Sequence, residues 1–179
     1  MDFSLNTEQQ MLQSTARKFA ADILPSEARL IEDKDIPPSL ELRKQFAEMG
    51  FLGINLPTRY GGAGLGHFEA VLVLEELAKI SIAAAFPVFE ASFGPSLAIA
   101  HFAPEELRQR ILPAVCNGGM VVAVSMSEPQ AGTALTDLKT TARLTGDKII
   151  LNGNKRWCSG AGHADAYVVY CRMSDAPGA

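Results

Sequence analysis

The chain has 179 residues, of which 47% are hydrophobic and 20% are charged, and its formal net charge is -4. This apolar content excludes a disordered chain, and a chain of this length can bury a substantial core. The acidic balance argues against nucleic acid as a partner, because phosphate binding needs a basic surface.

The first two thirds of the sequence have the periodicity of helices. A capping box at Thr7 and Gln10 predicts the start of the first helix, which Pro25 is expected to end or kink. A second helix is expected after Pro37-Pro38, with Gly50 as its C-cap.

An extended segment is predicted at 51–57, followed by a glycine loop at 59–66 with the sequence RYGGAGLG. A dinucleotide fingerprint needs a strand before the glycines and a helix after them, within a βαβ unit. The spacing fails here because its third glycine would fall at His67. We therefore interpret the loop as a tight connection packed under neighbouring helices.

Three more helical segments complete this part. The first buries Val71, and the second is an alanine-rich stretch after Ile80 that Gly94-Pro95 is expected to break in two. The last covers 103–115.

The period changes to two after residue 120, which indicates strands. We expect a buried strand at 121–126, a hairpin of 140–144 with 149–151, and an alternating strand at 166–172.

These patterns predict an α+β fold, in which an N-terminal all-helical bundle (1–119) precedes an incomplete antiparallel β-barrel-like domain (120–179). The predicted strands are too few to close a barrel, and 175–179 read as a loop. We expect either a truncated polypeptide or a β segment that needs a partner surface.

Three cysteines without CxxC spacing, Cys116, Cys158 and Cys171, favour free thiols in a reducing compartment, and we expect a cytoplasmic protein. The longest apolar stretch, near 80–93, is interrupted by polar residues and is too short to span a bilayer, so no membrane partner is expected.

Several residue types could suggest chemistry, but their spacing is unsuitable. His67, His101 and His163 lie far apart without paired ligands, which argues against a metal site. Lys155-Arg156 is interpreted as solvated surface. No GxSxG elbow is present.

Two segments remain as candidate sites. The first, 124–133, leaves a buried strand and reaches a bend of small residues, where Gly132 would let the backbone approach a ligand closely or adopt a positive φ. The hydroxyls of Ser127 and Thr133 can donate or accept hydrogen bonds. The second, 155–162, places Trp157 beside a glycine-rich turn, where an indole can form one wall of a slot for a flat ligand. The alternatives are a surface bend that caps a strand and a packed tryptophan.

Four pieces of sequence in register decide between these interpretations: LPTRYGGAGLG, RQRILPAVCNGG, SMSEPQAGTALTDLKTTA and LNGNKRWCSGAGHADAYVV. Together they resemble the acyl-CoA dehydrogenase family. The resemblance implies a helical domain, a middle β domain and a C-terminal four-helix domain that this chain lacks. It also implies FAD as cofactor, an acyl-CoA substrate, an electron-transfer flavoprotein as acceptor, and a homo-oligomer, either a tetramer or a dimer.

The resemblance also assigns residues. Ser127 would hydrogen-bond the pyrimidine side of the flavin, Thr133 would lie near the FAD pyrophosphate and the substrate, Trp157 would flank the ring, and Ser159 would bond near its reactive nitrogen. The residues so assigned to FAD binding are Val124, Ser125, Met126, Ser127, Gly132, Thr133, Trp157, Cys158 and Ser159.

Two positions depart from the family pattern. Ala134 stands where the family has Asp, and Gly160 stands where it has Asn. The family's carboxylate base belongs to the C-terminal domain, so no catalytic residue is assigned here, and Glu128 is not given that role. The departures leave room for an oxidase or monooxygenase of the same fold. A non-catalytic binding or assembly module would be marked by an exposed apolar strand edge.

Overall fold

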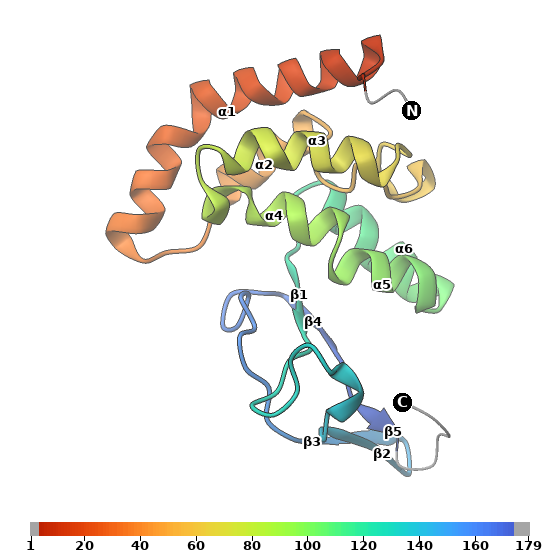
Figure 1. The fold of residues 1–179 in the computed structure, drawn as a ribbon. Coiled ribbons are helices and arrows are strands. Elements are labelled where there is room, and N and C mark those ends of the chain that lie inside the picture. Colours follow the sequence, from red (N-terminus) through yellow and green to blue (C-terminus); the bar gives the residue numbers. More distant parts are fainter. Residues whose placement is uncertain (1–3, 174–179) are drawn as a thin grey trace. The chain divides into compact units, whose positions relative to one another are not determined.

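The computed structural model describes residues 4–173 and divides the chain into two compact units, Met1–Val121 and Val122–Ala179 (Figure 1). We refer to them as unit 1 and unit 2 and describe each by itself. The loop expected at 175–179 lies outside the described residues.

Unit 1 is helical, as expected. Its elements are α1 (Thr7–Lys34), α2 (Leu40–Glu48), the short 3-10 helix η1 (Thr58–Tyr60), α3 (His67–Ala78), α4 (Ile82–Ser92), α5 (Pro95–Phe102) and α6 (Glu105–Cys116). The predicted break at Gly94-Pro95 is confirmed, because α4 ends at Ser92 and α5 begins at Pro95.

The first helix differs from the prediction at its start, and of the two effects expected of Pro25 the end of the helix does not occur. The capping box is made by Asn6 and Gln9, one residue earlier than predicted. Pro25 does not end the helix, which continues to Lys34, and Figure 1 shows that α1 changes direction along its length. A proline removes one helical hydrogen bond, and contacts elsewhere along a long helix can compensate for that loss.

The segment 51–57 was predicted to be extended, and this was wrong: it forms a series of turns. Its apolar side chains are buried, with Phe51 and Ile54 each 1% exposed. Periodicity could not show this because a short buried run of apolar residues looks the same in a turn and in a strand.

The glycine loop is packed tightly against these turns. A Cβ on Gly62 would lie 2.3 Å from the carbonyl oxygen of Leu56. The backbone N–H groups of Gly64 and Leu65 donate to carbonyls of Leu56 and Ile54, each at 2.9 Å. These N–H groups are therefore engaged by protein, as a structural connection requires.

Helices α1 and α3 pack against each other around a buried carboxylate. Glu76 on α3 is 3% exposed and accepts a bidentate pair of hydrogen bonds from Arg17 on α1, at 3.1 and 3.0 Å. Lys79 adds a third bond at 2.8 Å. The predicted burial of Val71 was wrong, since it is 47% exposed and α3 buries Val73 instead.

The apolar stretch is longer than the sequence indicated. By length and composition Ile82–Phe102, 21 residues, could cross a membrane, and half of its most apolar window is buried inside the protein. The core helix of a soluble protein passes the same test, so this is weak evidence for a membrane span.

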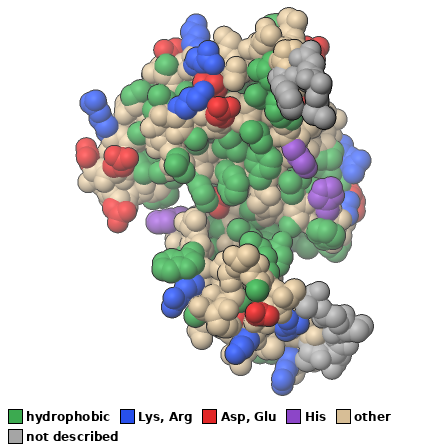
Figure 2. All heavy atoms as spheres, viewed as in Figure 1, with side chains coloured by type: hydrophobic (Ala, Val, Ile, Leu, Met, Phe, Trp, Pro, Cys, Tyr) green, Lys and Arg blue, Asp and Glu red, His purple; other side chains and the backbone are tan. Residues whose placement is uncertain are grey.

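An apolar groove of about 580 Å³ lies along this stretch, lined by Val71, Leu74, Glu75, Ala78, Ile82, Ala85, Phe86, Phe89 and Phe93. Apolar side chains gather over unit 1 on the face that Figure 2 shows.

Unit 2 contains two small open sheets, and the α+β class is confirmed. The strands are β1 (Val122–Ser125), β2 (Thr141–Thr145), β3 (Lys148–Asn152), β4 (Ala166–Val169) and β5 (Arg172–Met173), with the 3-10 helix η2 at Leu135–Asp137. The predicted hairpin is confirmed as the antiparallel pair β2–β3.

Strand orientation is mixed where antiparallel pairing was expected. β1 pairs with β4 in parallel, and β2 pairs with β5 in parallel. The long connection between β1 and β4 gives the chain room to return in the same direction, which parallel pairing requires. The single strand expected at 166–172 is divided, because β4 belongs to one sheet and β5 to the other.

Candidate functional site

The first candidate segment begins at the end of β1. Val124 and Ser125 close the strand, and Met126 and Ser127 continue it without a strand partner. All four residues are half-buried. The chain then folds back in a tight bend, in which Glu128 and Ala131 exchange two backbone hydrogen bonds of 2.8 and 3.1 Å.

The second candidate segment lies against the first. The backbone N–H of Arg156 donates to the carbonyl of Ser127 at 3.1 Å. The ammonium group of Lys155 donates to the carbonyl of Met126 at 2.8 Å. The structure thus brings together two segments that are about 30 residues apart in the sequence, and the 124–127 stretch runs beside the backbone that leads to Trp157.

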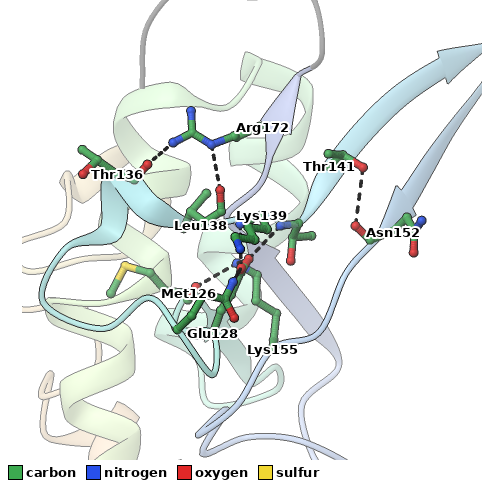
Figure 3. A network of polar contacts seen from close by, with 11 residues as sticks. Met126, Glu128, Thr136, Leu138, Lys139, Thr141, Asn152, Lys155 and Arg172 are labelled. Carbon is green, nitrogen blue, oxygen red and sulfur yellow. Dashed lines mark hydrogen bonds and ion pairs between the residues drawn. The ribbon is translucent and has the colours of Figure 1, made fainter.

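A buried carboxylate lies at the centre of this arrangement (Figure 3). Glu128 is 5% exposed. One of its oxygens, Oε1, accepts from Lys155 Nζ at 2.8 Å and from the Thr140 N–H at 2.9 Å. The other, Oε2, accepts from the Lys139 N–H at 2.6 Å and from Gln130 at 2.7 Å. Three stretches of chain therefore meet on one side chain.

The electrostatics of Glu128 follow from these bonds. Burial by itself raises the pKa of the carboxyl, but the hydrogen bonds from Lys139, Lys155 and Thr140 outweigh it and hold the pKa well below its usual range. The side chain is therefore ionised and fully engaged.

Trp157 is the most unusual residue of the second segment. Its side chain is 81% exposed, and its backbone φ of 67° lies in the left-handed region that favours glycine. The guanidinium of Arg156 lies 5.4 Å from the centre of its ring.

The turn that follows is held by a tyrosine. Tyr167 on β4 donates from its hydroxyl to the carbonyl of Gly160 at 3.2 Å and accepts from the Gly162 N–H at 3.1 Å. Cys158 is half-buried and Ser159 is exposed. The turn therefore presents Ser159 on the surface, two residues beyond the indole.

Gly132 and Thr133 lie on the exposed side of the bend. A Cβ built on Gly132 would meet nothing within 4 Å, and its φ is not in the left-handed region. The structure thus rules out a positive φ at this glycine, and the close approach of a ligand to its backbone stays a prediction. Within residues 4–173, no protein group bonds to the hydroxyls of Ser127, Thr133 or Ser159. In the described part of the chain these hydroxyls are therefore unengaged by protein, and the backbone at Gly132 is open.

The sequence analysis missed Lys155 and Arg172. Lys155 was interpreted as solvated surface, and this was wrong because its side chain is only 12% exposed and pairs with Glu128. Arg172 on β5 donates to the carbonyl of Leu138 at 2.7 Å and also to that of Thr136. Neither contact leaves a signal in the sequence, since each joins residues about 30 apart with no local pattern.

His67 contacts the side-chain amide of Asn55 at 2.5 Å, and no group of three potential metal ligands occurs in the described part of the chain. The cysteines Cys116, Cys158 and Cys171 are all free thiols.

Two family models match the chain in succession. Residues 6–119 match the model described as "Acyl-CoA dehydrogenase, N-terminal domain", and residues 123–179 match "Acyl-CoA dehydrogenase, middle domain".

Among curated proteins, the mitochondrial isovaleryl-CoA dehydrogenase of Bos taurus is 37% identical over 94% of this chain and 40% of its own length. The chain thus spans less than half of this relative. Among solved structures, a glutaryl-CoA dehydrogenase from Mycobacterium smegmatis in complex with FADH2 matches with a TM-score of 0.88 at 26% identity, covering 96% of this chain and 44% of that one. The prolyl acyl carrier protein oxidase AnaB matches with a TM-score of 0.80 at 29% identity, covering 94% and 45%.

Proposed function

Because the chain belongs to the acyl-CoA dehydrogenase family, we propose that it is the N-terminal portion of an FAD-dependent acyl-CoA dehydrogenase. The proposed reaction is the α,β-desaturation of an acyl-CoA thioester. The supporting observation is that the two candidate segments, 124–133 and 155–162, are hydrogen-bonded to each other through Arg156 and Ser127.

The donor set of this chain fits a flavin. A flat ring system needs an apolar face against it and polar groups at its rim. The exposed indole of Trp157 can supply the face, and the free hydroxyls of Ser127 and Ser159 can supply the rim contacts. The open bend at Gly132 and Thr133 leaves space for a pyrophosphate. A bound FAD would supply acceptance of the substrate's β-hydride.

The role of this chain's own residues is to hold and orient the cofactor. Ser127 and Ser159 hydrogen-bond the ring, Thr133 contacts the pyrophosphate and the substrate, and Val124, Ser125, Met126, Gly132 and Cys158 shape the surface beside it. No residue of this chain is assigned as the base that removes the α-proton, since Glu128 is fully engaged by Lys155 and backbone N–H groups.

The test is FAD binding by the full-length protein that carries this chain, with Trp157→Ala as the diagnostic variant. Alanine keeps the backbone strain of the left-handed position and removes only the indole, which is 81% exposed. We expect an unchanged melting temperature and FAD binding that is about tenfold weaker or more. A wild-type protein that binds no FAD would overturn the proposal.

An oxidase of the same fold is the second candidate, and the structural match to the prolyl acyl carrier protein oxidase favours it. An oxidase passes the two electrons and two protons of each turnover to O2 and releases H2O2. A dehydrogenase passes them to a protein acceptor, for which we propose an electron-transfer flavoprotein. Measuring H2O2 per turnover, with and without an artificial acceptor dye, separates the two.

We also propose a homo-oligomer and a cytoplasmic location. The free cysteines suit a reducing compartment. Sedimentation of the full-length protein and fractionation of its host cells test these two points.

A further inference from the structure

The pair of Glu128 and Lys155 joins the two segments of the proposed flavin site, and neither residue is among the candidates for contacting FAD itself. Glu128 follows Ser127 directly, and Lys155 precedes Trp157 by two residues. Their side chains meet at 2.8 Å, with exposed fractions of 1% and 12%. Lys155 also bonds the carbonyl of Met126 at 2.8 Å, so its ammonium group contacts the residues on both sides of Ser127 (Figure 3).

A buried ion pair is seldom kept for stability alone. Apolar side chains of similar volume often stabilise a fold as well or better, because removing two charges from water is costly. Such a pair instead fixes a geometry, because its hydrogen bonds are directional and because separating two buried charges is energetically costly. Here, that geometry sets the position of the 155–157 backbone relative to 126–128.

The strained backbone at Trp157 indicates that this geometry has a use. A tryptophan with φ of 67° is unfavourable and persists only where its surroundings impose it. Upstream, the bonds of Lys155 and of the Arg156 N–H fix the chain entering Trp157. Downstream, Tyr167 fixes the turn at Gly160.

We propose that Glu128 and Lys155 are positioning residues of the FAD site, which together hold Trp157 at a fixed distance from Ser127. This inference rests on the proposed function. The pair touches neither substrate nor reacting atoms and acts through the residues it holds. A displacement of about 1 Å in such a site can cost about 100-fold in rate.

The experiment compares variants of the full-length flavoprotein by their dissociation constant for FAD and by the visible circular dichroism of the bound flavin. Lys155→Met removes the ammonium group and keeps the length of the side chain. We expect FAD binding about 10- to 100-fold weaker and an altered flavin dichroism. Lys155→Arg keeps a charged donor and is expected to bind FAD closer to wild type than Lys155→Met does.

A matched control lies in unit 1. Glu76 is also a buried carboxylate, 3% exposed, with cationic partners from two positions, and it bonds to none of the FAD-binding candidates. Glu76→Gln is expected to lower stability while FAD affinity and flavin dichroism stay as in wild type. An equal loss of FAD affinity in this control would overturn the proposal.

The double variant Glu128→Gln with Lys155→Met separates positioning from mere stability. It leaves no unpaired buried charge, so the fold is expected to recover much of the stability that either single change removes. The positioning role predicts that FAD binding stays weak in this variant. Recovery of wild-type affinity, or wild-type affinity in Lys155→Met, would overturn the proposal.

Amide exchange of the apoprotein distinguishes the failure of this inference from that of the proposed function. The Arg156 N–H, bonded to Ser127, is expected to exchange at least about tenfold faster in Lys155→Met than in wild type. This holds whether or not FAD binds. A wild type that binds no FAD would end the proposed function, and an unchanged Arg156 exchange rate would end the positioning role.

Discussion

Glu76 and Glu90 lie on neighbouring helices of unit 1, and their surroundings favour opposite protonation states. The bonds from Arg17 lower the pKa of Glu76 to about 2. Burial without a charged partner raises the pKa of Glu90 to about 7. One carboxyl is thus an anion that joins α1 to α3, and the other, within α4, gains its proton as the pH falls through about 7.

The pH dependence of stability follows for Glu76. Its pKa is lower in the folded state, so its contribution is present above 4.5 and is lost as the pH falls toward about 2. Glu76→Gln should lower the free energy of unfolding by about 1–3 kcal/mol at neutral pH. The difference from wild type should shrink in acid, as urea titrations at several pH values would measure. A difference that stays constant down to the lowest pH would contradict this.

At the scale of elements, two glycines with different surroundings give opposite expectations. A methyl group on Gly62 would press into the backbone of Leu56, whereas one on Gly132 would project into open space. Gly62→Ala should lower the free energy of unfolding by about 1–3 kcal/mol, and Gly132→Ala should change it by less than about 0.5 kcal/mol. Chemical denaturation of both variants tests this, and similar losses in the two would contradict it.

The elements themselves were predictable where the signal is local. The β2–β3 hairpin has an alternating strand before Gly146-Asp147 and an apolar run after it, and the α4–α5 break has Gly94-Pro95. The turns at 51–57 were missed because a buried apolar run has no period of its own. The parallel β1–β4 pair and the burial of Lys155 were missed because each depends on a partner distant in sequence. The two site segments were found by their resemblance to a family, and their hydrogen bonds to each other could only come from the structure.

At the scale of the molecule, unit 2 exposes a strand edge. β3 lies at the end of its three-stranded sheet, and Ile149 and Ile150 are 62% and 51% exposed. Such an edge favours pairing with a second chain unless more polypeptide covers it. If the chain is a non-catalytic assembly module, the alternative raised in the sequence analysis, it would associate through this edge of β3.

The 179-residue chain by itself should therefore self-associate, with a sedimentation coefficient that rises with concentration. Ile150→Lys should reduce this association, because a lysine on an edge strand opposes pairing. Ile82→Lys, at a residue of unit 1 that is 72% exposed, is the control and should leave it unchanged. A chain that stays monomeric at every concentration would contradict this expectation.

The parallel pairing of β1 with β4 sets the order in which unit 2 can fold. The β2–β3 hairpin closes over a two-residue turn, and such hairpins form in about 1–10 μs. Pairing Val122 with Ala166 must instead close a loop of roughly 40 residues that contains this hairpin, which costs more chain entropy. The contacts between Ser127 and Arg156 lie inside that loop. During refolding, the β2–β3 hairpin should therefore form first. The capacity to bind a ligand at the two site segments should return later, as a separate and slower kinetic phase.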